Sequence, residues 1–148
     1  MKTLFFTIIL FFACVEAYSL DLTLSQGTVE PTPIAVSNFY SSNNSDAKIG
    51  KNIAMIISDN LERSGLFSPI NQKAFIQNSK SLSLQPRFED WKVIKAQHLI
   101  SGKIFKIENK ISVEFRLYDV LAQKELLAKK YETSEKNWRR VSHIISDA

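Results

Sequence analysis

The sequence predicts an α/β (α+β) domain in which a mixed β-sheet is packed against helices. Apolar residues recur every four positions between residues 49 and 61, which is typical of the buried stripe of a helix. By contrast, residues 111–119 alternate between apolar and polar side chains, which is typical of a half-buried strand. The expected order is strand, helix, strand, helix, three strands and helix, and this order favours a sheet covered by helices.

Residues 1–17 are expected to be a secretory signal peptide. Lys2 is the only charged residue before the apolar run Leu4 to Ala13, which is too short to span a bilayer and suits a signal-peptide core. Small or branched residues favour cleavage after Ala17, with cleavage after Ser19 as the second choice. Two alternatives stay open, a retained membrane anchor and a lipoprotein acylated at Cys14. After cleavage we expect no direct membrane insertion.

Residues 18–27 are expected to form a short extended N-terminal arm, and residues 28–148 the domain itself. The first part of the arm alternates between two sides of an extended chain, with Leu20, Leu22 and Leu24 on one side and Asp21 and Thr23 on the other. Gly27 interrupts the alternation before the next apolar run. The pattern is compatible with a core strand, a frayed terminus or a binding strand.

The first elements of the domain are expected to be a short buried strand at residues 34–36 and a long helix. Ser41 to Asp46 is polar and predicts a loop, in which Ser45 caps the helix and Asp46 lies at its positive end. The helix carries the stripe Ile49, Ile53, Ile57 and Leu61. Gly65 is expected to end it, because glycine adopts the left-handed conformation of a C-terminal cap at little cost.

The middle of the chain is expected to return to the sheet at Phe67 to Ile70. The serine-rich stretch Ser79 to Pro86 predicts a loop, and Phe88, Trp91 and Ile94 have the spacing of a short helix. Residues 97–107 follow as a strand, in which Gly102 permits a close backbone approach or a bulge.

The last part of the domain is expected to be a three-stranded meander and a helix. Asn109 is the turn residue before the alternating strand, whose inward residues are Ile111, Val113, Phe115 and Leu117. A third, less regular strand spans Leu126 to Glu132. Ser134 is then expected to cap a helix that carries an apolar side formed by Trp138, Val141 and Ile145.

Residues with catalytic or ligand-binding potential are few. Without the leader the chain has no cysteine, which excludes disulfides, a thiol nucleophile and cysteine metal ligands. His98 and His143 stand alone, and the carboxylates are isolated or lie on polar faces, so we predict no catalytic residues, no metal and no cofactor. The formal net charge of +4 comes from lysines scattered among acids, so we expect no nucleic-acid partner.

Five stretches, in order along the chain, resemble the N-terminal domain of the TolB family. They are LTLSQGTVEPTPIAVSNF, IGKNIAMIISDNLERSGLFSPINQKAFI, FEDWKVIKAQHLISGKI, VEFRLYDVLAQKELLAKKYET and WRRVSHIISDA. TolB is the periplasmic protein of the Tol–Pal cell-envelope system, and the resemblance implies a mixed sheet packed against two main helices. In the family a six-bladed propeller follows and carries the main Pal-binding surface. This sequence stops before it, so we expect a fragment, a truncated gene or half of a split one.

The resemblance also implies a role for the arm. In the family the residues after the signal peptide form a strand-like arm that is bound by the C-terminal domain of the inner-membrane protein TolA. The matching positions here are Leu20, Asp21, Leu22, Thr23 and Leu24, with Gly27 as the hinge. Binding to a Pal-like lipoprotein is expected only if a propeller is supplied elsewhere. The arm as an edge strand of its own domain remains an alternative, and a switching arm would satisfy both.

Two functions are therefore carried forward. The first is a non-enzymatic interaction module of the Tol–Pal system in the periplasm, which supports outer-membrane integrity and constriction during cell division. The second is an exported small-ligand-binding domain of similar fold. A ligand-binding domain should have a concave pocket with convergent polar groups, whereas an arm-based adaptor should have an unpaired N-terminus.

Overall fold

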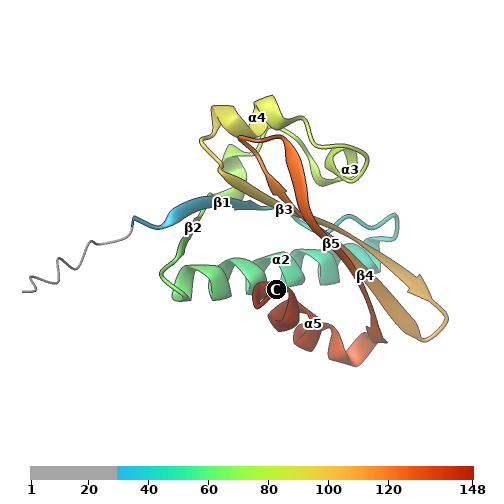
Figure 1. Ribbon diagram of the computed structural model, residues 1–148. Helices are drawn as coiled ribbons and strands as arrows, with labels where there is room; N and C mark the ends of the chain where they lie inside the picture. Colours follow the sequence, from blue (N-terminus) through green and yellow to red (C-terminus); the bar gives the residue numbers. More distant parts are fainter. Residues whose placement is uncertain (1–29) are drawn as a thin grey trace, which may run out of the picture.

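A computed structural model describes residues 30–148 and shows one five-stranded mixed sheet with helices on both faces (Figure 1). The strands lie in the order β2-β1-β3-β4-β5 and comprise β1 (Thr32–Val36), β2 (Phe67–Pro69), β3 (His98–Ile107), β4 (Lys110–Asp119) and β5 (Lys124–Ser134). The strands β2, β1 and β3 run parallel, whereas β3, β4 and β5 form the antiparallel meander. The predicted fold class is confirmed.

The helices divide between the two faces of this sheet (Figure 1). On one face lie α2 (Asn44–Arg63) and α5 (Trp138–Ser146), the two main helices. On the other face lie α3 (Ser79–Leu82) and α4 (Phe88–Val93), which belong to the connection from β2 to β3. Short 3-10 turns precede α3 and α5, at Gln72–Ala74 and Glu135–Asn137.

The long helix α2 forms as its periodicity predicts, but its cap differs. Ile53, Ile57 and Leu61 are buried against the sheet. Gly65 has a φ of 71°, the left-handed conformation expected after the helix. The N-cap, however, is Asn43, whose Oδ1 accepts a hydrogen bond from the backbone N of Ser45 at 3.2 Å. The prediction of Ser45 as the cap is wrong because the helix begins earlier.

Two further boundaries differ from the sequence prediction. Ser79 to Pro86 is not wholly a loop, because Asn78 accepts a hydrogen bond from the backbone N of Ser81 and thereby caps the short helix α3. Leu82 anchors that helix, with 2% of its surface exposed. Ser134 does not cap α5 with its side chain, since it ends β5 and a 3-10 turn intervenes.

Two hydrophobic clusters lie on opposite faces of the sheet. The larger one, under α2 and α5, is built from Ile34, Val36, Phe39, Ile53, Ala54, Ile57, Leu61, Ile100, Ile104, Ile111, Val113, Phe115, Val141 and Ile145. The smaller one, under α3 and α4, is built from Ala35, Leu82, Trp91, Ala96, Leu99, Tyr118 and Val120. Successive strand residues contribute to opposite clusters, as the pleat requires.

The predicted alternation of β4 holds for its inward residues up to Phe115, but Ser112, expected on the polar side, is buried with 1% of its surface exposed. Ile111, Val113 and Phe115 are buried, but Leu117 is only half-buried beside a register shift between it and Tyr118. Tyr118 lies on the side of the strand that was expected to be polar. It is nevertheless buried, because Phe88 of α4 packs on it edge-to-face at 5.9 Å. The face of β4 that was expected to be polar is therefore covered at Tyr118.

Gly102 of β3 is the predicted site of close approach, and the structure confirms it. A Cβ added at this position would lie 2.2 Å from ring atoms of Phe39 and 2.6 Å from the carbonyl oxygen of Glu114. Asn109 lies in the predicted turn between β3 and β4, where Glu108 takes the positive φ of 54°.

Candidate partner-binding surface

The proposed binding strand, Leu20, Asp21, Leu22, Thr23 and Leu24, and its hinge Gly27 lie outside the described residues. The structure does show where the arm joins the domain. Glu30 and Pro31 are exposed, and the backbone N of Thr32 donates to the carbonyl oxygen of Leu66 at 2.9 Å. The arm therefore joins β1, an interior strand, at its N-terminal end beside exposed Leu66.

The two edges of the sheet are unlike. On one side, β2 has three residues and includes Pro69, which has no backbone N–H. On the other side, β5 has 11 residues and, within residues 30–148, pairs only with β4. Sequence reasoning placed both strands but did not show which of them would border the sheet.

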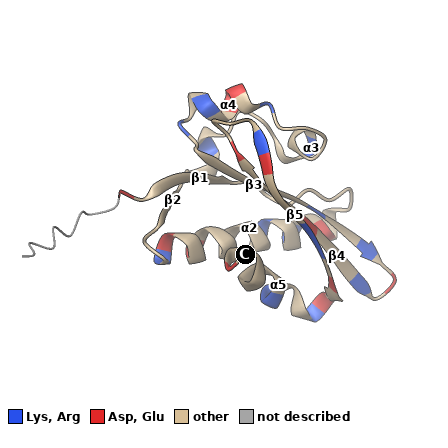
Figure 2. Ribbon diagram, in the orientation of Figure 1, with Lys and Arg blue, Asp and Glu red and all other residues tan. Residues whose placement is uncertain are grey.

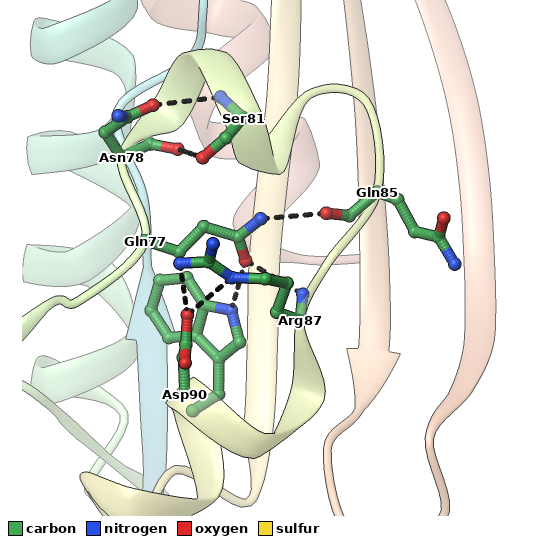
Figure 3. Close-up of polar contacts among 7 residues, drawn as sticks. Gln77, Asn78, Ser81, Gln85, Arg87 and Asp90 are labelled. Atoms are coloured by element: carbon green, nitrogen blue, oxygen red, sulfur yellow. Dashed lines mark hydrogen bonds and ion pairs between the residues drawn. The ribbon is translucent and has the colours of Figure 1, made fainter.

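The connection from β2 to β3 is fixed by Gln77, a buried polar residue that sequence reasoning missed (Figure 3). Its Oε1 accepts hydrogen bonds from the backbone N of Arg87 at 2.9 Å and from Nε1 of Trp91 at 3.1 Å. Its Nε2 donates to the carbonyl oxygen of Gln85 at 2.8 Å. Figure 3 shows this side chain between the two chain segments that lead into and out of α3. A single glutamine between Ile76 and Asn78 gives no periodic signal that could have identified it.

His143 forms a polar contact between the main helices. Asn60 of α2 donates through Nδ2 to Ser146 Oγ of α5 at 3.0 Å, and the same amide nitrogen lies 2.9 Å from Nδ1 of His143. Arg63 in turn bonds to Asn60 Oδ1. The histidine is thus a hydrogen-bonded, exposed side chain rather than part of a ligand cluster.

His98, at the start of β3, has a different environment. Its ring meets Phe67 edge-to-face with centroids 6.5 Å apart, and its Nδ1 is buried without a hydrogen-bond partner among the described residues.

Several charged side chains of the described chain form surface ion pairs. The closest pairs are Arg87 with Asp90, Lys106 with Glu135, Arg116 with Glu125, and Lys92 with Glu89. Lysines and arginines are spread over several elements (Figure 2). Within residues 30–148, no group of three or more His, Cys, Asp or Glu residues is placed to hold a metal ion. In the same range no helix has the length and apolar character needed to cross a membrane.

Among the side chains whose pKa departs from its ordinary value, Tyr118 is the one for which burial is the main cause. Loss of solvent raises the pKa of its phenol above 10.0, and the neighbouring Arg116 opposes that shift in part. A hydrogen bond from the guanidinium to Glu125 raises the pKa of Arg116 above its already high ordinary value. Both groups keep their ordinary charge near neutral pH, so neither is prepared for proton transfer.

Hollows in the described surface are open to solvent and differ in lining. One, of about 520 Å³, is bordered by Ile49 and Trp138 together with the start of the 3-10 turn before α5. A second, of about 380 Å³, lies where the chain leaves β1. It is lined by Asn38, Phe39, Tyr40, Ser41, Ala47, Lys51, Asn78, Ser79 and Lys80. This second hollow gathers several polar groups, including two lysines, from three segments.

The chain is similar to proteins of the Tol–Pal system. A family described as "TolB amino-terminal domain" matches residues 20–126. The Tol-Pal system protein TolB of Pelagibacter ubique (strain HTCC1062) is 41% identical over 143 residues, which cover 90% of this chain and 32% of that protein. The chain thus spans about a third of the length of this curated relative.

Solved structures share the fold at lower identity. The crystal structure of TolB from Acinetobacter baumannii superposes with a TM-score of 0.64 and 23% identity, covering 79% of this chain and 27% of that one. Lipoprotein GNA1162 from Neisseria meningitidis superposes with a TM-score of 0.57 and 13% identity, covering 79% and 96% of the two chains. At these identities the likeness concerns the fold alone.

Proposed function

The chain belongs to the TolB amino-terminal domain family, and from this membership we propose that it is a non-enzymatic periplasmic interaction module of the Tol–Pal system. Its partner is a TolA-like inner-membrane protein, which binds the N-terminal arm. Through this contact the module supports outer-membrane integrity and constriction during cell division. The observation that carries the proposal is the family match, which begins at residue 20 and so includes the arm.

Strand addition by the arm is energetically reasonable. Ordering five residues costs about 5–10 kcal/mol of backbone entropy, at about 1–2 kcal/mol each. The new backbone hydrogen bonds contribute only about 0.5–1.5 kcal/mol each, so they roughly balance that cost. Burial of Leu20, Leu22 and Leu24, at about 1.5–3 kcal/mol for each side chain, supplies the surplus.

We expect that the arm can be altered without unfolding the domain. The first backbone hydrogen bond of β1 is made by Thr32, and the core residues nearest to the arm begin at Ile34. Deletion of residues 18–26 should therefore leave the unfolding midpoint of the domain nearly unchanged while abolishing partner binding.

Calorimetry with the C-terminal domain of a TolA-like partner tests the arm. Leu22→Ala and Leu24→Ala should each weaken binding by about tenfold or more, since each removes at least about 1.5 kcal/mol of apolar burial. Asp21→Ala and Thr23→Ala serve as matched controls with small effects, whereas Thr23→Pro should be worse if its N–H bonds the partner's edge. Unchanged affinity after deletion of the arm would move the search to the folded surface.

Export is tested separately. N-terminal sequencing of the protein recovered from the periplasm of an expressing cell should start at Tyr18 or Leu20. An intact leader, or a lipid on Cys14, would contradict soluble release into the periplasm. Binding to a Pal-like lipoprotein is proposed only for a complex in which a propeller domain is present.

A small-ligand-binding domain is the second candidate, and the polar hollow beyond β1 favours it. Lys51 of α2 and Lys80 of α3 border this hollow together with Asn78, so a small anion is the ligand that suits it. Titration with inorganic phosphate and acetate, followed by amide chemical shifts, tests this candidate. Saturable shifts at these residues would support it, whereas shifts spread evenly over surface lysines would contradict it.

A further inference from the structure

The hollow beyond β1 lies where two connections leave the sheet on opposite faces. From β1 the chain passes through α2 on one face to reach β2, and from β2 it crosses the other face through α3 and α4 to reach β3 (Figure 1). These three strands are parallel, with β1 between the other two. In open sheets this arrangement leaves a crevice outside the carboxyl ends of the strands, and ligands commonly bind there. The hollow is lined by both connections, through residues 38–41 and α2 on one side and residues 78–80 on the other.

Each of these connections contributes a lysine to the hollow, Lys51 from α2 and Lys80 from α3. Within residues 30–148 neither lysine takes part in an ion pair. No acid stands three or four positions from either lysine along the chain, and none is among the described residues that line the hollow. Because the described chain does not neutralise this positive charge, the hollow attracts an anion.

Asn38 gives the wall of the hollow a polar group with a different requirement. It follows β1, and its Oδ1 is buried without a hydrogen-bond partner among the described residues. A buried amide oxygen without a partner is costly, and it can only accept hydrogen bonds. A bare anion has no hydrogen to offer, whereas a hydroxyl group on the same ligand is a suitable donor. Asn38 therefore favours a ligand that carries hydroxyl groups beside its charge.

The remaining polar groups and the size of the hollow agree with such a ligand. Tyr40, Ser41 and Ser79 line it with hydroxyls, which can both donate and accept hydrogen bonds. Tyr40 is half-buried, so its ring also offers aromatic surface at the wall. The volume of about 380 Å³ falls in the lower part of the range of small-molecule sites. A bare phosphate or acetate ion would leave most of that volume unfilled.

We propose that this hollow binds a small hydroxylated anion of the size of a monosaccharide, either a sugar acid or a sugar phosphate. Lys51 and Lys80 bind the charged group, and a hydroxyl of the ligand donates to Asn38 Oδ1. The proposal rests on the second candidate function, because it names the chemical class of the anion bound at that same hollow. It is independent of the N-terminal arm and of the partner that the arm binds.

The test titrates the ¹⁵N-labelled full chain with glucuronate and with glucose-6-phosphate, and uses acetate, inorganic phosphate and glucose as comparisons. At least one of the two charged sugars should shift the amides of residues 38–41, 51 and 78–80 saturably, about tenfold or more tightly than the bare ions or glucose. Binding of only one charged sugar identifies the charged group as a carboxylate or a phosphate. If the bare ions bind at the hollow as tightly as the charged sugars, the anion site stands and this proposal is wrong. If no probe binds there, both are wrong.

Variants at the hollow separate the roles of its residues. Lys51→Gln and Lys80→Gln should each weaken binding of the charged sugar by about tenfold, whereas Lys48→Gln, at an exposed lysine of α2 outside the lining, should not. Asn38→Leu should reduce the affinity for the charged sugar to about that for the bare ion. It should not lower the unfolding midpoint, because the Oδ1 that it removes has no partner in the described domain. An equal loss in Lys48→Gln, or an unchanged preference for the sugar in a folded Asn38→Leu variant, would overturn the proposal.

Discussion

The two faces of the sheet are covered in different ways. On one face α2, with 20 residues, and α5 lie on a cluster made of apolar side chains. On the other face the cover consists of α3, with four residues, and α4, with six, joined by irregular chain. That cover is held by the buried polar side chain of Gln77 as well as by Trp91.

The difference has a physical cause. A regular helix satisfies its backbone hydrogen bonds internally, so an apolar stripe is enough to dock it. An irregular connection leaves backbone groups such as the N–H of Arg87 and the carbonyl of Gln85 in need of partners. Gln77 supplies both at once, and its remaining capacity orients the indole of Trp91. An irregular cover therefore depends on a few specific contacts, whereas a helical cover distributes its stability over many.

The largest effect is expected at Trp91, which is fully buried between α4 and the sheet. Trp91→Ala should lower the free energy of unfolding by about 3–5 kcal/mol, since it leaves a large cavity. Urea unfolding followed by far-UV circular dichroism measures the change. A loss below about 1 kcal/mol would mean that the α3–α4 face contributes little to stability.

On the helical face, Ile57→Ala should cost about 2–5 kcal/mol, because Ile57 is fully buried in the larger cluster. Met55→Ala on the exposed side of the same helix is the matched control, since Met55 is 54% exposed. The same urea titration compares the two variants. Equal losses would contradict the assignment of the inward stripe.

Gln77→Leu tests whether the irregular cover depends on its polar anchor. The variant leaves the Trp91 indole and two backbone groups without partners, at about 1–3 kcal/mol for each buried group that water does not reach. Gln85→Leu is the control, because only the backbone carbonyl of Gln85 is used and its side chain is exposed. Native-state hydrogen exchange should show faster opening of residues 77–93 in Gln77→Leu and not in Gln85→Leu.

The smallest effect is expected at the helix caps. Asn78→Ala and Asn43→Ala each remove a side-chain cap, at about 0.5–2 kcal/mol. Since α3 has only one turn and α2 has five times its length, we expect local opening of α3 but intact α2. Amide exchange at Leu82 and Ile53 distinguishes the two. Equal fraying of both helices would remove the contrast between the faces.

Much of the fold could be predicted because its signals are local. The stripe of Ile53, Ile57 and Leu61, the alternation through Phe115 and the terminating Gly65 each depend on residues close in sequence. The short helix α3 could not be read in this way, because one turn is too short to show a period and its stability comes from Asn78 and the buried Leu82.

The binding features also differ in whether a local sequence signal reveals them. The alternation of Leu20, Asp21, Leu22, Thr23 and Leu24 is visible in the sequence, and its use as a binding strand remains a proposal. That β5 borders the sheet was not visible, because this position depends on the order of the strands.

The sequence by itself determined the main helices and the strands, though not the one-turn helix α3, since periodicity and caps act over a few residues. The tertiary structure alone decided which strands border the sheet, which face each helix covers, and that Gln77 bridges residues 8 to 14 positions away. These properties depend on contacts between distant segments. Their free energies are set by geometry in three dimensions, where loop closure and the pairing of backbone groups select one arrangement among many that share the same local pattern.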